Sequence, residues 1–192
     1  LRDQQLAYRE DFTTGTSAAA AGGVTTVVDM PNNRPVTMSV ETLKERMRLA
    51  ESRLLVNVAF NSAFPTKSDD IHQVVDAGAV GFKLYLLEQI GGVNITDDNA
   101  LLKSFKVTRQ AKVPVAVHAE DKAMIERAQK NLMKQGRNDL KAFVESHKPV
   151  AEEKATQRAT ELSGISGAHL HVCHVSSEKA MRVFLGAKKR GY

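Results

Sequence analysis

The chain has 192 residues, of which 42% are hydrophobic and 26% are charged, a composition typical of an ordinary globular protein. This composition excludes collagen-like, low-complexity and disordered chains. The net charge is +5, but the basic residues are spread among acidic ones, aromatic residues make up only 5%, and Trp is absent. A nucleic-acid-binding surface needs a basic patch or stacking aromatic side chains, so we do not expect one.

The location expected from the sequence is the cytoplasm. No apolar run approaches the roughly 18 residues that cross a bilayer, and the first residues lack the apolar core of a secretory leader. The single cysteine, Cys173, cannot form an internal disulfide, which suits a reducing compartment. The chain opens in a polar segment without an initiator Met and stops directly after a basic stretch. We therefore expect a piece of a longer protein.

Short β-rich runs alternate with longer helical ones along the chain. In chain order we expect a helix over 11–22, a strand over 24–29, a loop over 30–38, a helix over 39–53, a strand over 54–60, a short helix over 68–76, a strand over 79–85, a helix over 96–111, a strand over 113–118, helices over 120–135 and 149–163, a strand over 169–174 and a last helix from Ser176 or Ser177. The run at 24–29 is continuous and β-branched, as in a strand buried on both faces.

This alternation, without hairpin turns between the strands, predicts an α/β fold with parallel strands and helical crossovers. A doubly wound sheet and a (β/α)₈ barrel both fit. In a barrel, functional groups lie at the carboxyl ends of the strands. The polar residues that end the predicted strands are therefore the informative ones, namely Asp29, Lys83, His118 and His174.

Two of these residues have the chemistry of zinc ligands. Imidazole nitrogen binds zinc well, and His118 and His174 at neighbouring strand ends could reach one ion. The ammonium of Lys83 has no lone pair, but carbamylation by carbon dioxide would turn it into a carboxylate able to bridge two metals. The alternative is that each His is an ordinary polar residue and that Lys83 extends to solvent.

The run 169–174 offers two sets of side chains to the two faces of its strand. By the period of two, His169, His171 and Cys173 share one face, and Leu170, Val172 and His174 share the other. We expect the second set to face the barrel interior, because His174 stands at the carboxyl end.

Five short motifs occur in an order and spacing that resemble those of the cyclic amidohydrolases, and most of all the dihydroorotases. They are Leu1-Arg2-Asp3, Met30-Pro31-Asn32-Asn33-Arg34-Pro35, Gly81-Phe82-Lys83-Leu84-Tyr85, His118-Ala119-Glu120-Asp121 and His171-Val172-Cys173-His174-Val175-Ser176. The resemblance spans the whole chain. It implies a (β/α)₈ TIM barrel of the metal-dependent hydrolase type, present here from about strand two to helix six.

The resemblance also assigns a metal site. Lys83 would be the carbamylated strand-four lysine bridging two zinc ions, and His118 and His174 would be the strand-five and strand-six ligands. A His-x-His pair of the first strand would precede Leu1, and the catalytic Asp of strand eight would follow Tyr192. Residues 1–192 would thus form a partial barrel domain without a catalytic residue, and we expect the chain alone to be inactive.

The implied reaction is the zinc-dependent, reversible hydrolysis of dihydroorotate to carbamoyl-aspartate in pyrimidine biosynthesis. Arg2 and Asn32 would hold the carboxylate of this small-molecule substrate, and the intact enzyme would be a homo-oligomer. An allantoinase or hydantoinase is the enzymatic alternative, because Lys83 is typical of both. A non-catalytic scaffold is less favoured, since a scaffold has no use for Lys83, His118 and His174 together.

Overall fold

A five-stranded, entirely parallel sheet with the strand order β1-β2-β3-β4-β5 organises the chain. The computed structural model describes residues 1–2, 5 and 7–191. The strands are β1 (Thr26–Asp29), β2 (Asn57–Ala63), β3 (Ala79–Tyr85), β4 (Val115–His118) and β5 (Leu170–Val172). Each strand pairs with the strand that follows it in the sequence, as expected when each strand is followed by a helical crossover.

Helical segments precede the first strand, connect each strand to the next and follow the last strand. They are α1 (Phe12–Ala21), α2 (Val40–Ala50), a short 3₁₀ helix (Ser68–Asp70) leading into α3 (Ile71–Asp76), α4 (Asp98–Gln110), α5 (Lys122–Lys134), α6 (Leu140–Ser146), α7 (Pro149–Ser166) and α8 (Glu178–Lys189). Within the described part of the chain, no helix has both the length and the apolar character that a membrane span requires.

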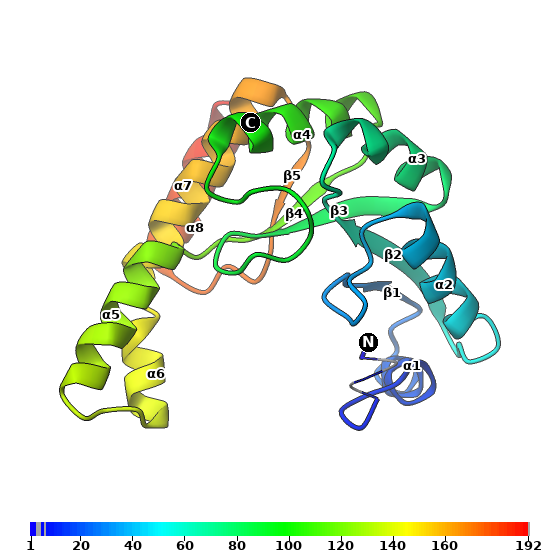
Figure 1. Ribbon diagram of the computed structural model, residues 1–192, viewed down its shortest axis with the longest axis horizontal. Coiled ribbons are helices and arrows are strands. Elements are labelled where there is room, and N and C mark those ends of the chain that lie inside the picture. Colours follow the sequence, from blue (N-terminus) through cyan, green and yellow to red (C-terminus); the bar gives the residue numbers. More distant parts are fainter. Residues whose placement is uncertain (3–4, 6, 192) are drawn as a thin grey trace.

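The sheet curls into an arch, and the helices α2, α3, α4, α7 and α8 lie along its outer side (Figure 1). A doubly wound sheet would have helices on both faces, whereas a barrel has them only outside. The arch is therefore part of a (β/α) barrel, and the expectation of an incomplete barrel is confirmed.

The hydrophobic core fills the space between the sheet and the outer helices. Alternate side chains of β3 and β4 point into it, and all of them are at most 1% exposed: Phe82, Leu84, Val115 and Val117. Phe82 stacks on Phe64 with ring centroids 5.1 Å apart, and Phe64 stacks in turn on Phe105 of α4 at 6.1 Å. Because strand side chains alternate, the residues between these point to the concave side of the arch.

Close approach of three chain segments requires glycine on that concave side. A Cβ placed on Gly81 would lie 2.9 Å from Oδ1 of Asn61 and 3.0 Å from the carbonyl oxygen of Pro114. Gly81 thereby lets β2 and the start of β4 lie tightly against β3, on the strand that two residues later bears Lys83.

Most predicted elements occur within a few residues of their expected positions, but three predictions are wrong. The strand over 24–29 was expected to be buried on both faces, yet Val28 is 45% exposed, because β1 lies at the edge of the described sheet. The second strand was expected over 54–60 and covers Asn57–Ala63, because Asn61 and Ser62, which read as polar residues beyond its end, continue the pairing with β3. Helix α6 was not expected. Its Leu140 and Phe143 are 80% and 56% exposed, so it lacks the buried apolar face that periodicity detects.

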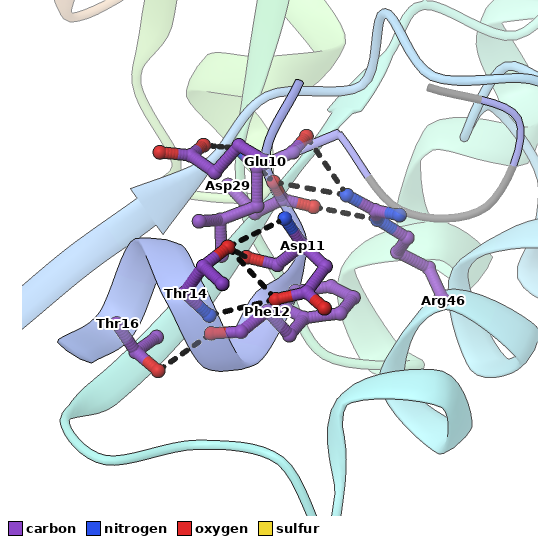
Figure 2. A network of polar contacts seen from close by, with 8 residues as sticks. Glu10, Asp11, Phe12, Thr14, Thr16, Asp29 and Arg46 are labelled. Carbon is purple, nitrogen blue, oxygen red and sulfur yellow. Dashed lines mark hydrogen bonds and ion pairs between the residues drawn. The ribbon is translucent and has the colours of Figure 1, made fainter. Parts of the chain in front are cut away.

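A buried ion pair joins the end of β1 to α2. Nε of Arg46 donates to Oδ2 of Asp29 at 2.7 Å and Nη2 to Oδ1 at 3.2 Å, and both side chains are less than 5% exposed. The guanidinium carbon also lies 4.4 Å from the ring centroid of Phe12 in α1. Figure 2 shows Arg46 reaching toward Asp29 and Phe12. The pair therefore connects α1, β1 and α2.

We expect Asp29→Asn to lower the free energy of unfolding by about 3–5 kcal/mol, because it leaves the buried Arg46 charge without its carboxylate. The measurement is urea unfolding of the whole protein. Glu45→Gln is the control, since the Glu45–Arg48 pair is exposed and its loss is not expected to move the midpoint. Equal midpoints for the two variants would contradict this role of the Asp29–Arg46 pair.

Candidate metal centre

The register of three neighbouring strands brings the predicted ligands to one edge of the sheet. Lys83 pairs with Ala116, Tyr85 pairs with His118, and the backbone N–H of Cys173 donates to the carbonyl of Val117 at 3.0 Å. These side chains are out of phase with the apolar core, so they lie on the concave side at the carboxyl ends of β3, β4 and β5. A barrel has its functional groups at this edge.

The two predicted imidazole ligands lie in direct contact. Nδ1 of His118 is 3.1 Å from Nε2 of His174, and their ring centroids are 4.8 Å apart. The other nitrogen of His118, Nε2, lies 2.7 Å from Oε2 of Glu120. A carboxylate at Nε2 favours the tautomer with its proton there, which directs the lone pair of Nδ1 toward His174.

The surroundings of His118 favour a neutral ring. Burial lowers the pKa of His118, and the nearby charges of His174 and Lys83 lower it further, while the hydrogen bond and charge of Glu120 act in the opposite direction. The net pKa lies below the ordinary imidazole value. Since a metal binds only an unprotonated nitrogen, this environment suits a ligand.

His174 reaches His118 by a different route from the one that the period of two predicts. Leu170 and Val172 pack against the core that lies under the helices, so the strand itself presents Cys173 to the concave side. The strand ends at Val172, and His174 has a φ of +37°, which few residues other than Gly adopt. This turn of the backbone brings the imidazole back to His118. The expected residue is in place, but the expected face of the strand is wrong.

Lys83 is buried rather than extended to solvent. Its side chain is 3% exposed, and Nζ lies 3.4 Å from Sγ of Cys173 and 4.5 Å from the ring centroid of Tyr85. Burial lowers the pKa of Lys83, although Cys173 partly offsets this effect. A larger share of neutral amine follows, and the neutral amine is the form that adds carbon dioxide. The alternative of a solvent-exposed lysine is wrong.

Three residues at this edge were not assigned a role from the sequence. They are Tyr85, Glu120 and Cys173. Burial raises the pKa of Tyr85 to about 12, even though the charge of Arg2 lowers it, so the phenol keeps its proton at neutral pH. Tyr85 lies two residues after Lys83 in the same strand, so the alternation of side chains could have placed it on the same face. No local pattern indicated that Cys173 would contact Lys83.

Arg2 and Asn32, the predicted substrate residues, are both half-buried. The Arg2 charge is close enough to influence Tyr85, and Asn32 lies in the loop that follows β1. Neither side chain is hydrogen-bonded to another residue of the described chain, so their joint binding of a carboxylate stays a prediction. The neighbouring Asn33 has a local role, because its Oδ1 accepts hydrogen bonds from N and Oγ1 of Thr37 at 3.1 Å and 3.0 Å.

The donor set fits part of a zinc site. Two nitrogens bound to a tetrahedral zinc at 2.0–2.1 Å are about 3.3 Å apart, close to the 3.1 Å between His118 and His174. Among residues 1–2, 5 and 7–191, no three His, Cys, Asp or Glu side chains gather closely enough to hold a metal ion. Lys83 could complete a set with the two imidazoles only as a carbamate, whose oxygens are metal ligands.

Comparisons with known proteins identify the family of this chain. The model of the dihydro-orotase-like family matches residues 1–180. The chain is similar to an allantoinase from Deinococcus radiodurans, at 30% identity over 194 residues that cover 100% of this chain and 43% of the relative. It is also similar to a dihydroorotase from Methanothermobacter thermautotrophicus, at 31% identity over 183 residues that cover 95% of this chain and 41% of the relative.

Among solved structures, the chain is similar to the L-hydantoinase (dihydropyrimidinase) from Arthrobacter aurescens. The TM-score is 0.90 and the identity 30%, over 98% of this chain and 43% of that protein. The chain therefore spans less than half the length of these relatives. The family match and the partial barrel lead to the same conclusion: the chain belongs to the dihydroorotase-like family of cyclic amidohydrolases.

Proposed function

We propose that the whole protein containing this chain is a zinc-dependent cyclic amidohydrolase and, within that class, a dihydroorotase that interconverts dihydroorotate and carbamoyl-aspartate. The contact between His118 and His174, at the sheet edge that also holds the buried Lys83, is the observation that supports this most strongly. Zinc, when bound, supplies Lewis acidity toward an amide carbonyl and an activated water.

Lys83 enters this scheme through its own chemistry. The neutral amine forms an N–C bond with carbon dioxide and releases one proton, which leaves a carbamate with two oxygen ligands. Burial supports this step, because it disfavours the competing ammonium form. Glu120 holds His118 with Nδ1 toward His174, so both imidazoles present nitrogen to the same space.

Two residues suited to binding a carboxylate of the substrate, Arg2 and Asn32, favour dihydroorotase within the family. Arg2 has a planar, permanently charged guanidinium group that binds carboxylates bidentately. It lies close enough to Tyr85 for its charge to lower the pKa of that phenol. Asn32 follows β1 at the same ends of the strands. The alternative is an allantoinase or hydantoinase, which the similarity to relatives with those names supports. The pyrimidine pathway, the homo-oligomer and the cytoplasmic location stay predictions.

Lys83→Ala is expected to abolish hydrolysis of cyclic amides by the whole protein and to reduce its zinc content. Both effects follow from the loss of the bridging carbamate. A short carboxylic acid added to the assay is expected to restore part of the activity, because it can occupy the space of the missing carbamate. Activity and zinc content are measured on the same preparation.

Lys103→Ala serves as the matched control, since Lys103 is 64% exposed and pairs only at the surface with Asp69. Its activity and zinc content are expected to equal those of the wild type. Wild-type rate and zinc content in Lys83→Ala would refute the proposed metal site.

Arg2→Met is expected to raise KM for dihydroorotate by one to two decades, because a charge-assisted hydrogen bond contributes about 1.5–3 kcal/mol. KM for a hydantoin without a carboxylate is expected to stay within about twofold. Arg34→Met is the control, because Arg34 is exposed in the loop after β1. Steady-state kinetics with both substrates give the comparison, and an unchanged KM for dihydroorotate would count against the dihydroorotase assignment.

A further inference from the structure

The loop that leaves β5 and contains His174 is fixed by one carboxylate from α7. Oε1 of Glu152 accepts the backbone N–H of Ser176 at 2.7 Å, and Oε2 accepts the backbone N–H of Ser177 at 2.8 Å. The hydroxyl of Ser176 adds a third hydrogen bond to Oε2 at 3.2 Å. Glu152 is only 9% exposed, so these bonds lie largely out of water.

These bonds do more than cap α8. The side chain of Ser177 already caps that helix by accepting the N–H of Ala180 at 3.2 Å. The Glu152 carboxylate instead accepts the backbone N–H groups of Ser176 and Ser177, which lie two and three residues after His174. Burial opposes ionisation of Glu152, yet the hydrogen bonds from Ser177 and Ser176 outweigh it and lower its pKa, so the group is charged at neutral pH.

The backbone at His174 needs such support. A φ of +37° in a residue with a side chain is held only where the surrounding structure imposes it, and such conformations cluster at functional sites. Two residues after this turn, the chain meets the Glu152 carboxylate. The turn is therefore bounded on one side by β5 and on the other by two charge-assisted hydrogen bonds.

We propose that Glu152 is a positioning residue that, by anchoring Ser176 and Ser177, holds His174 in the strained turn that places its Nε2 against Nδ1 of His118. The role of Glu152 in zinc binding rests on the function proposed above. The positioning itself does not, because it follows from the hydrogen bonds between Glu152 and the backbone of Ser176 and Ser177.

Glu152→Gln tests this proposal with little change in side-chain volume. Its amide keeps one oxygen acceptor, so it can serve only one of the two backbone N–H groups and places its own NH₂ against the other. In the whole protein we expect zinc affinity to fall about 10–100-fold, in the range for residues that orient metal ligands. We also expect kcat to fall and KM to stay within twofold, because His174 orients metal rather than substrate.

Glu153→Gln is the matched control on the same helix. Glu153 is 36% exposed, and its Oε2 lies 3.8 Å from Nζ of Lys179. Zinc affinity and kcat of this variant are expected to equal those of the wild type. A Glu152→Gln protein that unfolds at a lower temperature but keeps wild-type zinc affinity and kcat would overturn the proposal, since Glu152 would then act only on stability.

A second readout separates this proposal from the proposed function. The ¹⁵N NMR shifts of the His118 and His174 rings in the metal-free whole protein are expected to change in Glu152→Gln and not in Glu153→Gln. If the wild type binds no zinc, the proposed function fails, and these shifts still decide the positioning role: identical imidazole shifts in the wild type and Glu152→Gln would overturn it. Should Glu152→Gln not fold, Ser176→Ala removes a single bond, and the same changes are expected at smaller size.

Discussion

The parallel register between β3 and β4, in which Lys83 lies opposite Ala116 and Tyr85 opposite His118, is the constraint on which the candidate site depends. A slip of one residue would turn every side chain of one strand to the other face. Lys83 would then enter the apolar layer under the helices, and Phe82 would face the concave side. The well-packed core thus fixes the register, and the register in turn brings the polar strand ends together.

Burial of a lysine costs free energy of folding, so a lysine buried near the strand ends indicates a chemical role. Among the described residues, the near partners of Lys83 Nζ are Sγ of Cys173 at 3.4 Å and the aromatic ring of Tyr85, which are weak substitutes for water. A protein with no function at this edge would be more stable with an apolar side chain there. In the proposed site, carbamylation would resolve this conflict, because the modified group would be held by the metal that it binds. The imidazoles of His118 and His174 lie 3.1 Å apart beside it and would supply nitrogen ligands to the same metal.

The sequence alone was sufficient for the alternation of elements, the parallel sheet and the position of His118 at the end of β4, since all of these follow from local patterns. Lys83 was expected to end its strand, but β3 continues for two more residues to Tyr85. It was not sufficient for the turn at His174, where a positive φ replaces the regular alternation of the strand. Contacts made across the fold, such as Cys173 with Lys83 and Glu152 with the loop after β5, leave no local pattern. Helix α6 was missed for a different reason. Its apolar residues are exposed, whereas hydrophobic periodicity reports burial against a core.

A crystal structure of the whole protein, grown with zinc and bicarbonate, tests the central claim most directly. The account predicts a carboxylate on Nζ of Lys83, in contact with zinc that is also bound by Nδ1 of His118 and Nε2 of His174. It further predicts that Nζ no longer lies as an amine against Sγ of Cys173. An unmodified Lys83 still against Cys173, with zinc absent from the two imidazoles, would contradict the account.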